Sequence, residues 1–331
     1  MSDKKTEEME KIADKLISRY SINANAKLLT DAEKDTIKEY IMGSARLDEL
    51  YSFADNMPVK WWYSIQTGLV EFDNTYNDEG FFRRCIIVHT LMRMENELHR
   101  CLIAHENWQQ FSPEKIEKLY AGYEKEGLKL KYQLYIIDIM DEGGYKVNNE
   151  EVLADALRKV FTRYLDERRE ETLEAFAGAS ALARWFALTV LAQKPEENKS
   201  EILSYAQDGA SIVRNLLFDI LCERKDWEEE IKKLAISKKL AERELAARVL
   251  INWQSSGIDC VKILSDMLEK EKSAKLAALI RNSISENTGT GESADKSTVR
   301  SQNEITPDEL VKQLHKGGKK RLLSILPQTR F

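Results

Sequence analysis

The chain has 331 residues, of which 43% are hydrophobic and 32% charged, and its net charge is −6. Its 14 glycines and 5 prolines are too few for the turns of a β-rich fold of this length, whereas helices joined by short loops need few turn residues. The acidic balance argues against a duplex-binding protein, since phosphate neutralisation requires a strongly basic surface. We therefore expect an all-α protein that forms two domains or one long array of repeats.

The chain begins MSDKKTEEMEK, which is charged where a signal peptide would need an apolar stretch. No apolar run approaches the roughly 20 residues that cross a bilayer. Four cysteines are scattered without a CxxC pair, which indicates a reducing compartment and no disulfide framework. These features predict a cytoplasmic protein that does not associate with a membrane.

The sequence of residues 1–145 predicts an irregular helical region that forms an N-terminal cap on the segment after it. Apolar residues recur at helical spacing over 9–20. Thr30 or Asp31 can serve as the N-cap of the next helix, and Gly43 can end it. A helix is therefore expected between these signals.

Three further helices are predicted before residue 145. Pro58 is suited to the first turn of the helix that continues over 59–72, because its missing N–H is not needed there. An apolar-periodic stretch, 79–105, predicts one long helix. Pro113 opens another, and Gly143-Gly144 marks the next break.

Residues 146–285 contain internal repeats with a period of about 30 residues, in the range typical of helical solenoids. Three segments share an arginine in the same position and apolar residues at matching distances after it, and a fourth, looser copy lacks the arginine. The copies are ALARWFALTVLA (181–192), SIVRNLLFDILC (211–222), LAERELAARVLI (240–251) and SAKLAALI (273–280).

Shorter amphipathic segments, 198–207 and 227–236, precede the second and third copies, so each repeat is expected to be a helical hairpin. Two helices alone cannot bury their apolar faces, but stacking the next pair buries them and makes the core continuous. We therefore predict an α-solenoid, a right-handed superhelix of hairpins. On this alignment Leu216 faces the core, and Leu216→Asp is expected to unfold the array.

The arginines in the shared position, Arg184, Arg214 and Arg243, allow two interpretations. Each can pair with acidic neighbours in the adjacent repeat and set the stacking register. Alternatively, the three line a concave face that binds anions. A cation near a helix N-terminus opposes the helix dipole, so a compensating acidic partner is expected.

Tryptophans in the repeats, Trp185 and Trp253, allow a similar choice. They either stack on a base or a peptide at the same candidate binding surface, or they pack in the core.

Residues 286–305 are rich in Ser, Thr, Gly and charge, which predicts a flexible linker. Residues 306–331 predict the start of a further helical module, too small to bury itself, so the chain is expected to be the N-terminal part of a longer protein. Basic residues beside a double glycine there form a weak anion-binding candidate. Its members are Lys316, Gly317, Gly318, Lys319, Lys320 and Arg321.

Two Cys-x3-His pairs, Cys85 with His89 and Cys101 with His105, have spacing suited to metal ligation on one helix face. On a continuous helix the two pairs are separated by roughly 18 Å of rise, too far for a shared ion. No nucleophile–base signature surrounds any of the four histidines. We therefore expect no metal, no cofactor and no assignable catalytic residue.

The segments ARWFALTVLA and AERELAARVLINW resemble degenerate HEAT repeats, with the arginine early in each second helix. The closing DELVKQLHKGGKKRLLSIL resembles the passage that follows the helical repeats in large bacterial proteins of the molybdate-metabolism-regulator-like group, whose C-terminal domain has no assigned function. The first resemblance implies a solenoid that binds protein or nucleic acid. Neither carries catalytic residues onto this chain.

The leading hypothesis is a non-enzymatic scaffold that presents a concave surface to a protein partner or to the rest of its own polypeptide. One alternative is a HEAT-like DNA-repair glycosylase, or another nucleic-acid-binding solenoid, which would need a positive groove containing the three arginines. A second alternative is a regulatory arm of a larger bacterial enzyme.

Overall fold

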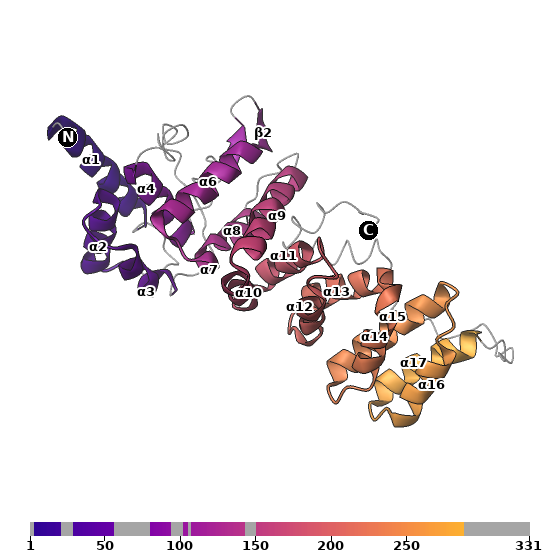
Figure 1. Cartoon of the computed structure of the whole chain (residues 1–331). Helices are drawn as coiled ribbons and strands as arrows, with labels where there is room; N and C mark the ends of the chain where they lie inside the picture. The colour runs from indigo at the N-terminus through magenta and orange to yellow at the C-terminus, as the bar shows by residue number, and fades with distance from the viewer. Residues whose placement is uncertain are drawn as a thin grey trace, which may run out of the picture. The chain divides into compact units, whose positions relative to one another are not determined.

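The computed structural model describes residues 3–20, 29–55, 80–93, 102–104, 107–142 and 150–287. Nearly all of these residues are helical (Figure 1), which confirms the predicted all-α class apart from one pair of short strands. The chain divides into two compact units, and the division lies between Ala183 and Arg184, inside α11 (Ala181–Leu191). The boundary predicted at residue 145 falls outside the described residues and stays a prediction. The helix predicted over 59–72 and the structure predicted for 288–331 also lie outside them.

The first unit contains the helices from the N-terminus to the start of α11, together with a 3₁₀ turn, η1 (Leu47–Leu50). They are α1 (Asp3–Tyr20), α2 (Asp31–Met42), α3 (Tyr51–Ala54), α4 (Gly80–Leu91), α6 (Pro113–Glu126), α7 (Leu130–Gln133), α8 (Tyr135–Glu142), α9 (Glu150–Glu167) and α10 (Arg169–Ala177).

Helix ends in this unit follow the local signals in the sequence. Thr30 caps α2 through its hydroxyl, which accepts the N–H of Glu33, while the Glu33 carboxylate accepts the N–H of Thr30. Gly43 ends the helix at φ 90°, a left-handed conformation that glycine adopts without steric cost. Ser112 caps α6 with Pro113 in its first turn. These predicted caps are confirmed.

The helices of the first unit pack in series, α1 on α2, α2 on α4, α4 on α6, α6 on α9 and α9 on α10. Aromatic side chains fill the core between α6 and α9. The Tyr120 ring meets those of Tyr123 and Phe161 edge to face, with centroids 5.3 and 5.7 Å apart. Arg83 of α4 also pairs with Glu126 of α6 at 2.8 Å.

The single long helix predicted over 79–105 is wrong. Helix α4 ends at Leu91, and Arg93 has a positive φ of 53°, which a continuing helix does not allow. Further along, strands β1 (Ile103–Ala104) and β2 (Asn107–Phe111) pair antiparallel. Apolar periodicity alone did not reveal the backbone reversal that interrupts the stretch.

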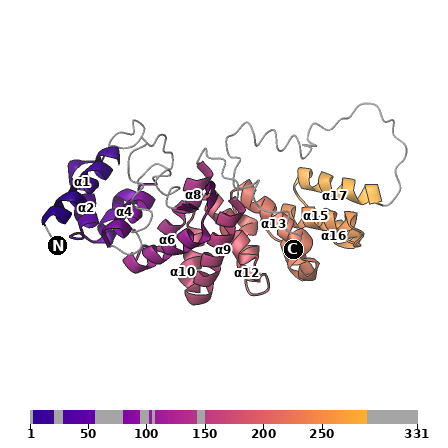
Figure 2. The same ribbon diagram turned by 90° about the horizontal axis from the view of Figure 1, so that it is seen from above.

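The second unit begins within α11 and contains α12 (Lys199–Ser204), α13 (Ser211–Glu223), α14 (Glu228–Ala235), α15 (Leu240–Ser255), α16 (Val261–Lys270) and α17 (Ala274–Asn287). The sequence copies coincide with α11, α13, α15 and α17, and the predicted shorter helices with α12 and α14. Figure 2 shows α13, α15 and α17 in succession, and α15 packs on both α13 and α17. The helices of the second, third and fourth copies therefore pack in series.

The placement of Leu216 in the core is wrong. Its side chain is half-buried, whereas that of Leu217 is fully buried. The inward stripe of α13 is Val213, Leu217, Ile220 and Leu221, which follows the i, i+4, i+7, i+8 spacing of one helix face. The rest of the α13 stripe keeps the positions that the alignment based on Arg214 predicts, and only Leu216, at the edge of the stripe, is less buried than its counterparts Phe186 and Leu245.

We predict that Leu217→Ala lowers the free energy of unfolding by about 2–5 kcal/mol, because it removes buried methyl groups and leaves a cavity. Leu216→Ala is the matched control, and it should cost less than half as much, since part of that side chain is already in water. Urea denaturation of both variants measures the difference. Equal losses would show that the assignment of the inward face is incorrect.

Candidate functional site

The three arginines predicted to share a repeat position occupy equivalent places in the second unit. Arg184, Arg214 and Arg243 are each the fourth residue of their helix, α11, α13 and α15. At that position the helix dipole disfavours a cation, so each guanidinium needs compensation from outside its own helix.

Arg184 finds its compensation in Asp208, just ahead of α13. Its Nε and Nη2 donate to the two carboxylate oxygens at 2.6 and 2.9 Å, a bidentate arrangement. The Asp208 carboxylate also accepts the N–H of Ala210 at 2.8 Å. Burial opposes ionisation of Asp208, but the bonds from Arg184 and Ala210 outweigh it and lower its pKa.

Arg243 makes the same kind of pair with Glu271, in the turn before α17. Its Nε and Nη2 donate to the carboxylate at 2.8 and 3.0 Å, and its Nη1 donates to the backbone oxygens of Ser237 and Lys238. The Glu271 side chain is only 1% exposed and also accepts the N–H of Ser273 at 2.7 Å. The hydrogen bonds from Arg243 hold the pKa of Glu271 at about 2.

Arg214 differs from the other two arginines because no carboxylate pairs with it among the described residues. Its Nη1 donates to the backbone oxygen of Asp208, as Arg243 does to that of Ser237, six residues earlier in each case. The turn residue that corresponds to Asp208 and Glu271 is Ser237, which cannot supply a negative charge. The expected acidic partners are therefore present for two arginines of three.

Asp208, Ser237 and Glu271 are equivalent in a second respect. Each side-chain oxygen accepts the N–H two residues later, in Ala210, Lys239 and Ser273 respectively. The turn residue thus organises the start of the following helix. In two of the three turns it also binds the arginine of the preceding hairpin.

The two tryptophans proposed for a binding surface are buried. Trp185 is 4% exposed and Trp253 is 1% exposed, and the Trp253 Nε1 donates to the Cys222 backbone oxygen at 2.9 Å. Neither indole face is open to a base or a peptide, because both pack within the repeats. The packing interpretation holds for this pair.

Trp227, which the sequence did not single out, is also fully buried. Its Nε1 donates to Glu196 at 3.0 Å, across 31 residues, and the Arg224 guanidinium lies 4.8 Å from the ring centroid. Arg224 also pairs with Glu196. In the sequence, the basic and acidic residues that flank this tryptophan in RKDWEEE were the available indication that it forms polar contacts.

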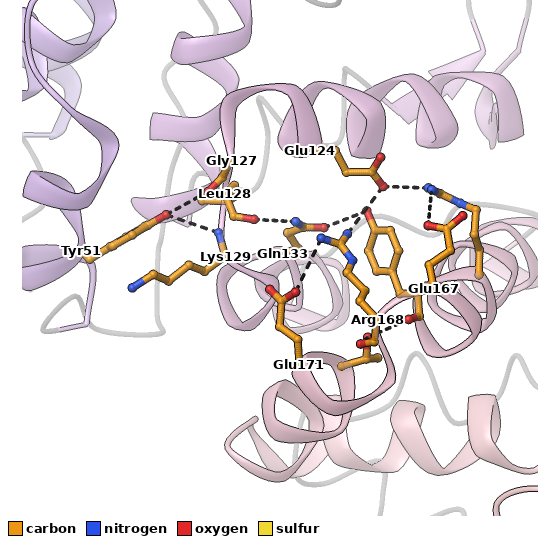
Figure 3. A network of polar contacts seen from close by, with 12 residues as sticks. Tyr51, Glu124, Gly127, Leu128, Lys129, Gln133, Glu167, Arg168 and Glu171 are labelled. Atoms are coloured by element: carbon orange, nitrogen blue, oxygen red, sulfur yellow. Dashed lines mark hydrogen bonds and ion pairs between the residues drawn. The ribbon is translucent and has the colours of Figure 1, made fainter.

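A polar cluster of the first unit joins α6, α7, α9 and α10 (Figure 3). Arg163 binds Glu124 at 2.8 Å, and Arg168 lies 3.7 Å from the same carboxylate and 3.9 Å from the centroid of the Tyr164 ring. Burial opposes ionisation of Glu124, but hydrogen bonds from Tyr164 and Arg163 lower its pKa. Burial and the carboxylate raise the pKa of Tyr164. Neither group is poised to exchange a proton near neutral pH.

Gln133 extends this cluster toward the N-terminal helices. Its amide nitrogen donates to the Leu128 backbone oxygen at 2.7 Å, and its amide oxygen accepts the hydroxyl of Tyr164 at 3.1 Å. The Tyr51 hydroxyl accepts the Lys129 N–H at 3.3 Å. Since these bonds fix the loop between α6 and α7, the cluster stabilises the fold.

The thiols of the described cysteines are not activated. Burial raises the pKa of Cys85 and Cys260, and it raises that of Cys222 to about 12. In the described ranges no group of three or more His, Cys, Asp or Glu side chains is arranged to hold a metal ion. Cys101, His105 and the anion-binding candidate at 316–321 lie outside those ranges.

Within the part of the chain that the structure describes, no helix combines the length and apolar composition needed to span a membrane. Comparisons with protein-family models, with curated proteins and with solved structures found no match. The resemblances to HEAT repeats and to the molybdate-metabolism-regulator-like group therefore stay predictions.

We predict that Arg243→Ala lowers the free energy of unfolding by on the order of 3 kcal/mol, because it leaves the buried Glu271 carboxylate unpaired. The control is Arg281→Ala on α17, an exposed arginine with no ion pair among the described residues, which should change stability by less than about 0.5 kcal/mol. Chemical denaturation compares them. Similar small losses would mean that the pair does not hold the hairpins together.

The pair also predicts an acid-sensitive component of stability. The pKa of Glu271 is lowered from 4.5 to about 2 in the folded state, so its contribution is complete above pH 4.5 and is lost as the pH falls toward 2. Glu271→Gln should be less stable than wild type at pH 6 and should lose less further stability between pH 5 and 2. Glu244→Gln, at an exposed position of α15, should keep the wild-type pH profile in urea titrations.

Proposed function

We propose that this chain is a non-enzymatic helical-repeat scaffold that binds a protein partner or the remainder of its own longer chain. In this proposal residues 146–285 form an α-solenoid of HEAT-like hairpins, preceded by a helical N-terminal cap. Such an array offers a long surface without needing a pocket, since each repeat contacts mainly its neighbours.

The observation that carries this proposal is the sequence offset of the polar contacts between hairpins. Arg184 reaches Asp208 across 24 residues, Arg243 reaches Glu271 across 28, and Trp253 reaches Cys222 across 31. These offsets cluster around the repeat period of about 30 residues seen in the sequence. Contacts that recur at offsets close to one repeat length support a chain built of stacked equivalent units.

The nucleic-acid alternatives, a HEAT-like glycosylase above all, depend on free arginines and exposed tryptophans in successive second helices. Asp208 and Glu271 neutralise Arg184 and Arg243, and Trp185 and Trp253 are buried. These observations favour the scaffold. A regulatory arm of a larger bacterial enzyme would use the same surface, with its own catalytic region as the partner.

We expect the purified chain to show no base release from a duplex that contains an alkylated purine, and no saturable binding to that duplex in fluorescence anisotropy at about 150 mM salt. Tagged chain expressed in its native cells should retain a partner protein that, once purified, binds it reversibly in a 1:1 titration. Release of the damaged base, or tight duplex binding abolished by Arg214→Glu, would refute the scaffold and support the glycosylase.

A further inference from the structure

One edge of the second unit is continuous across three turns between helices. Arg184 binds Asp208 in the first turn, and Gln207 of that turn accepts a bond from Lys239 in the second. Arg243, which bonds the backbone of the second turn, binds Glu271 in the third. The three turns therefore lie side by side.

This edge carries more cations than carboxylates. Its carboxylates are Asp208, Glu271 and the buried Glu242, which accepts a bond from Ser237. The first two are already bound to Arg184 and Arg243. Three further cations, Lys238, Lys239 and Lys272, have no carboxylate partner among the described residues, and Arg214 shares the charge of Asp208 with Arg184.

The surplus is centred on the second turn, where Ser237 replaces the carboxylate of the other two turns. Because Ser237 carries no charge, Arg214 bonds the Asp208 backbone oxygen and shares the charge of the Asp208 carboxylate with Arg184. Lys238 and Lys239 follow directly, and both are exposed. The second turn is therefore more positively charged than the other two turns, although the chain as a whole has a net charge of −6.

Two large apolar side chains flank the same lysines. Ile236, at the end of α14, is 75% exposed, and Leu240, the first residue of α15, is 47% exposed. Burying such side chains against a partner is favourable, and neighbouring exposed apolar side chains with a polar rim are a feature of interaction sites.

We propose that this basic edge, made of Arg214, Ile236, Lys238, Lys239 and Leu240, docks an acidic protein segment in which carboxylates alternate with aliphatic or aromatic residues. Carboxylates of that segment pair with the lysines and Arg214, and its apolar side chains cover Ile236 and Leu240. The proposal rests on the scaffold function and identifies its surface and the chemistry of its partner.

Charge complementarity selects this occupant. A positive patch on a net-acidic protein attracts an anionic partner and repels copies of the protein's own acidic surface. A nucleic acid would satisfy the lysines but would present phosphate and sugar to Ile236 and Leu240. An acidic peptide with apolar residues satisfies both features.

The test uses the full chain and a fluorescein-labelled peptide in which Asp and Glu alternate with Leu and Phe. The comparison probes are a peptide of equal charge with Ser in place of the apolar residues, and a single-stranded DNA of equal charge. Binding is followed by anisotropy at two salt concentrations. We expect the acidic-apolar peptide to bind most tightly, and its affinity to fall as salt rises.

Two double variants separate the contributions. Lys238→Glu with Lys239→Glu should weaken peptide binding at least tenfold, and Ile236→Ser with Leu240→Ser about fivefold. The control, Lys262→Glu with Lys270→Glu at exposed positions of α16, should stay within twofold of wild type. All substituted residues are exposed, and the bond from Lys239 to Gln207 that is lost lies at the surface, so melting temperatures should stay close to that of wild type.

Absence of peptide binding, equal binding by all variants, or tighter binding of the DNA through the same lysines would overturn the proposal. The scaffold function can survive that failure. If the native partner binds wild type and the lysine variant equally, the scaffold stands and only this surface is incorrect.

Discussion

The ion pair between Arg243 and Glu271 is the interaction on which the arrangement of the last hairpins depends. An arginine in the first turn of a helix is disfavoured by the dipole, and a carboxylate that is 1% exposed is disfavoured by loss of water. Each group is tolerable only because the other is present. The carboxylate belongs to the turn of the next hairpin, so the pair is satisfied at one relative position of the two hairpins and at no shifted one.

The same rule separates the residues that hold the array together from those that remain for a partner. A guanidinium whose charge is balanced by bidentate bonds to a buried carboxylate attracts an anionic ligand much less than an uncompensated one does. Arg184 and Arg243 are therefore structural, although their position suggested a column of anion-binding groups. In the proposed scaffold, recognition falls to cations that the turns leave uncompensated.

How much the sequence could predict depended on how local each signal was. The Thr30 cap and the Gly43 end involve contacts within a few residues, and both were predictable. Acidic partners for the repeat arginines were predictable in kind, because the dipole argument needs no coordinates. The partial exposure of Leu216 was not, since it depends on how closely the neighbouring helices approach that edge of the stripe. The end of α4 at Leu91 depended likewise on packing beyond the local pattern.

The turns between the repeats do not share one residue type, since Asp208, Ser237 and Glu271 occupy equivalent places, and this difference has a physical meaning. Ser237 accepts the N–H of Lys239, as the carboxylates of the other turns accept the N–H two residues later. It lacks the charge that those carboxylates use to bind an arginine. A protein under selection for stability alone would place a carboxylate there. The second turn lacks this carboxylate although the turns on both sides have one, and it lies beside Ile236, the most exposed isoleucine of the described residues. Such a local departure is expected where function outweighs stability.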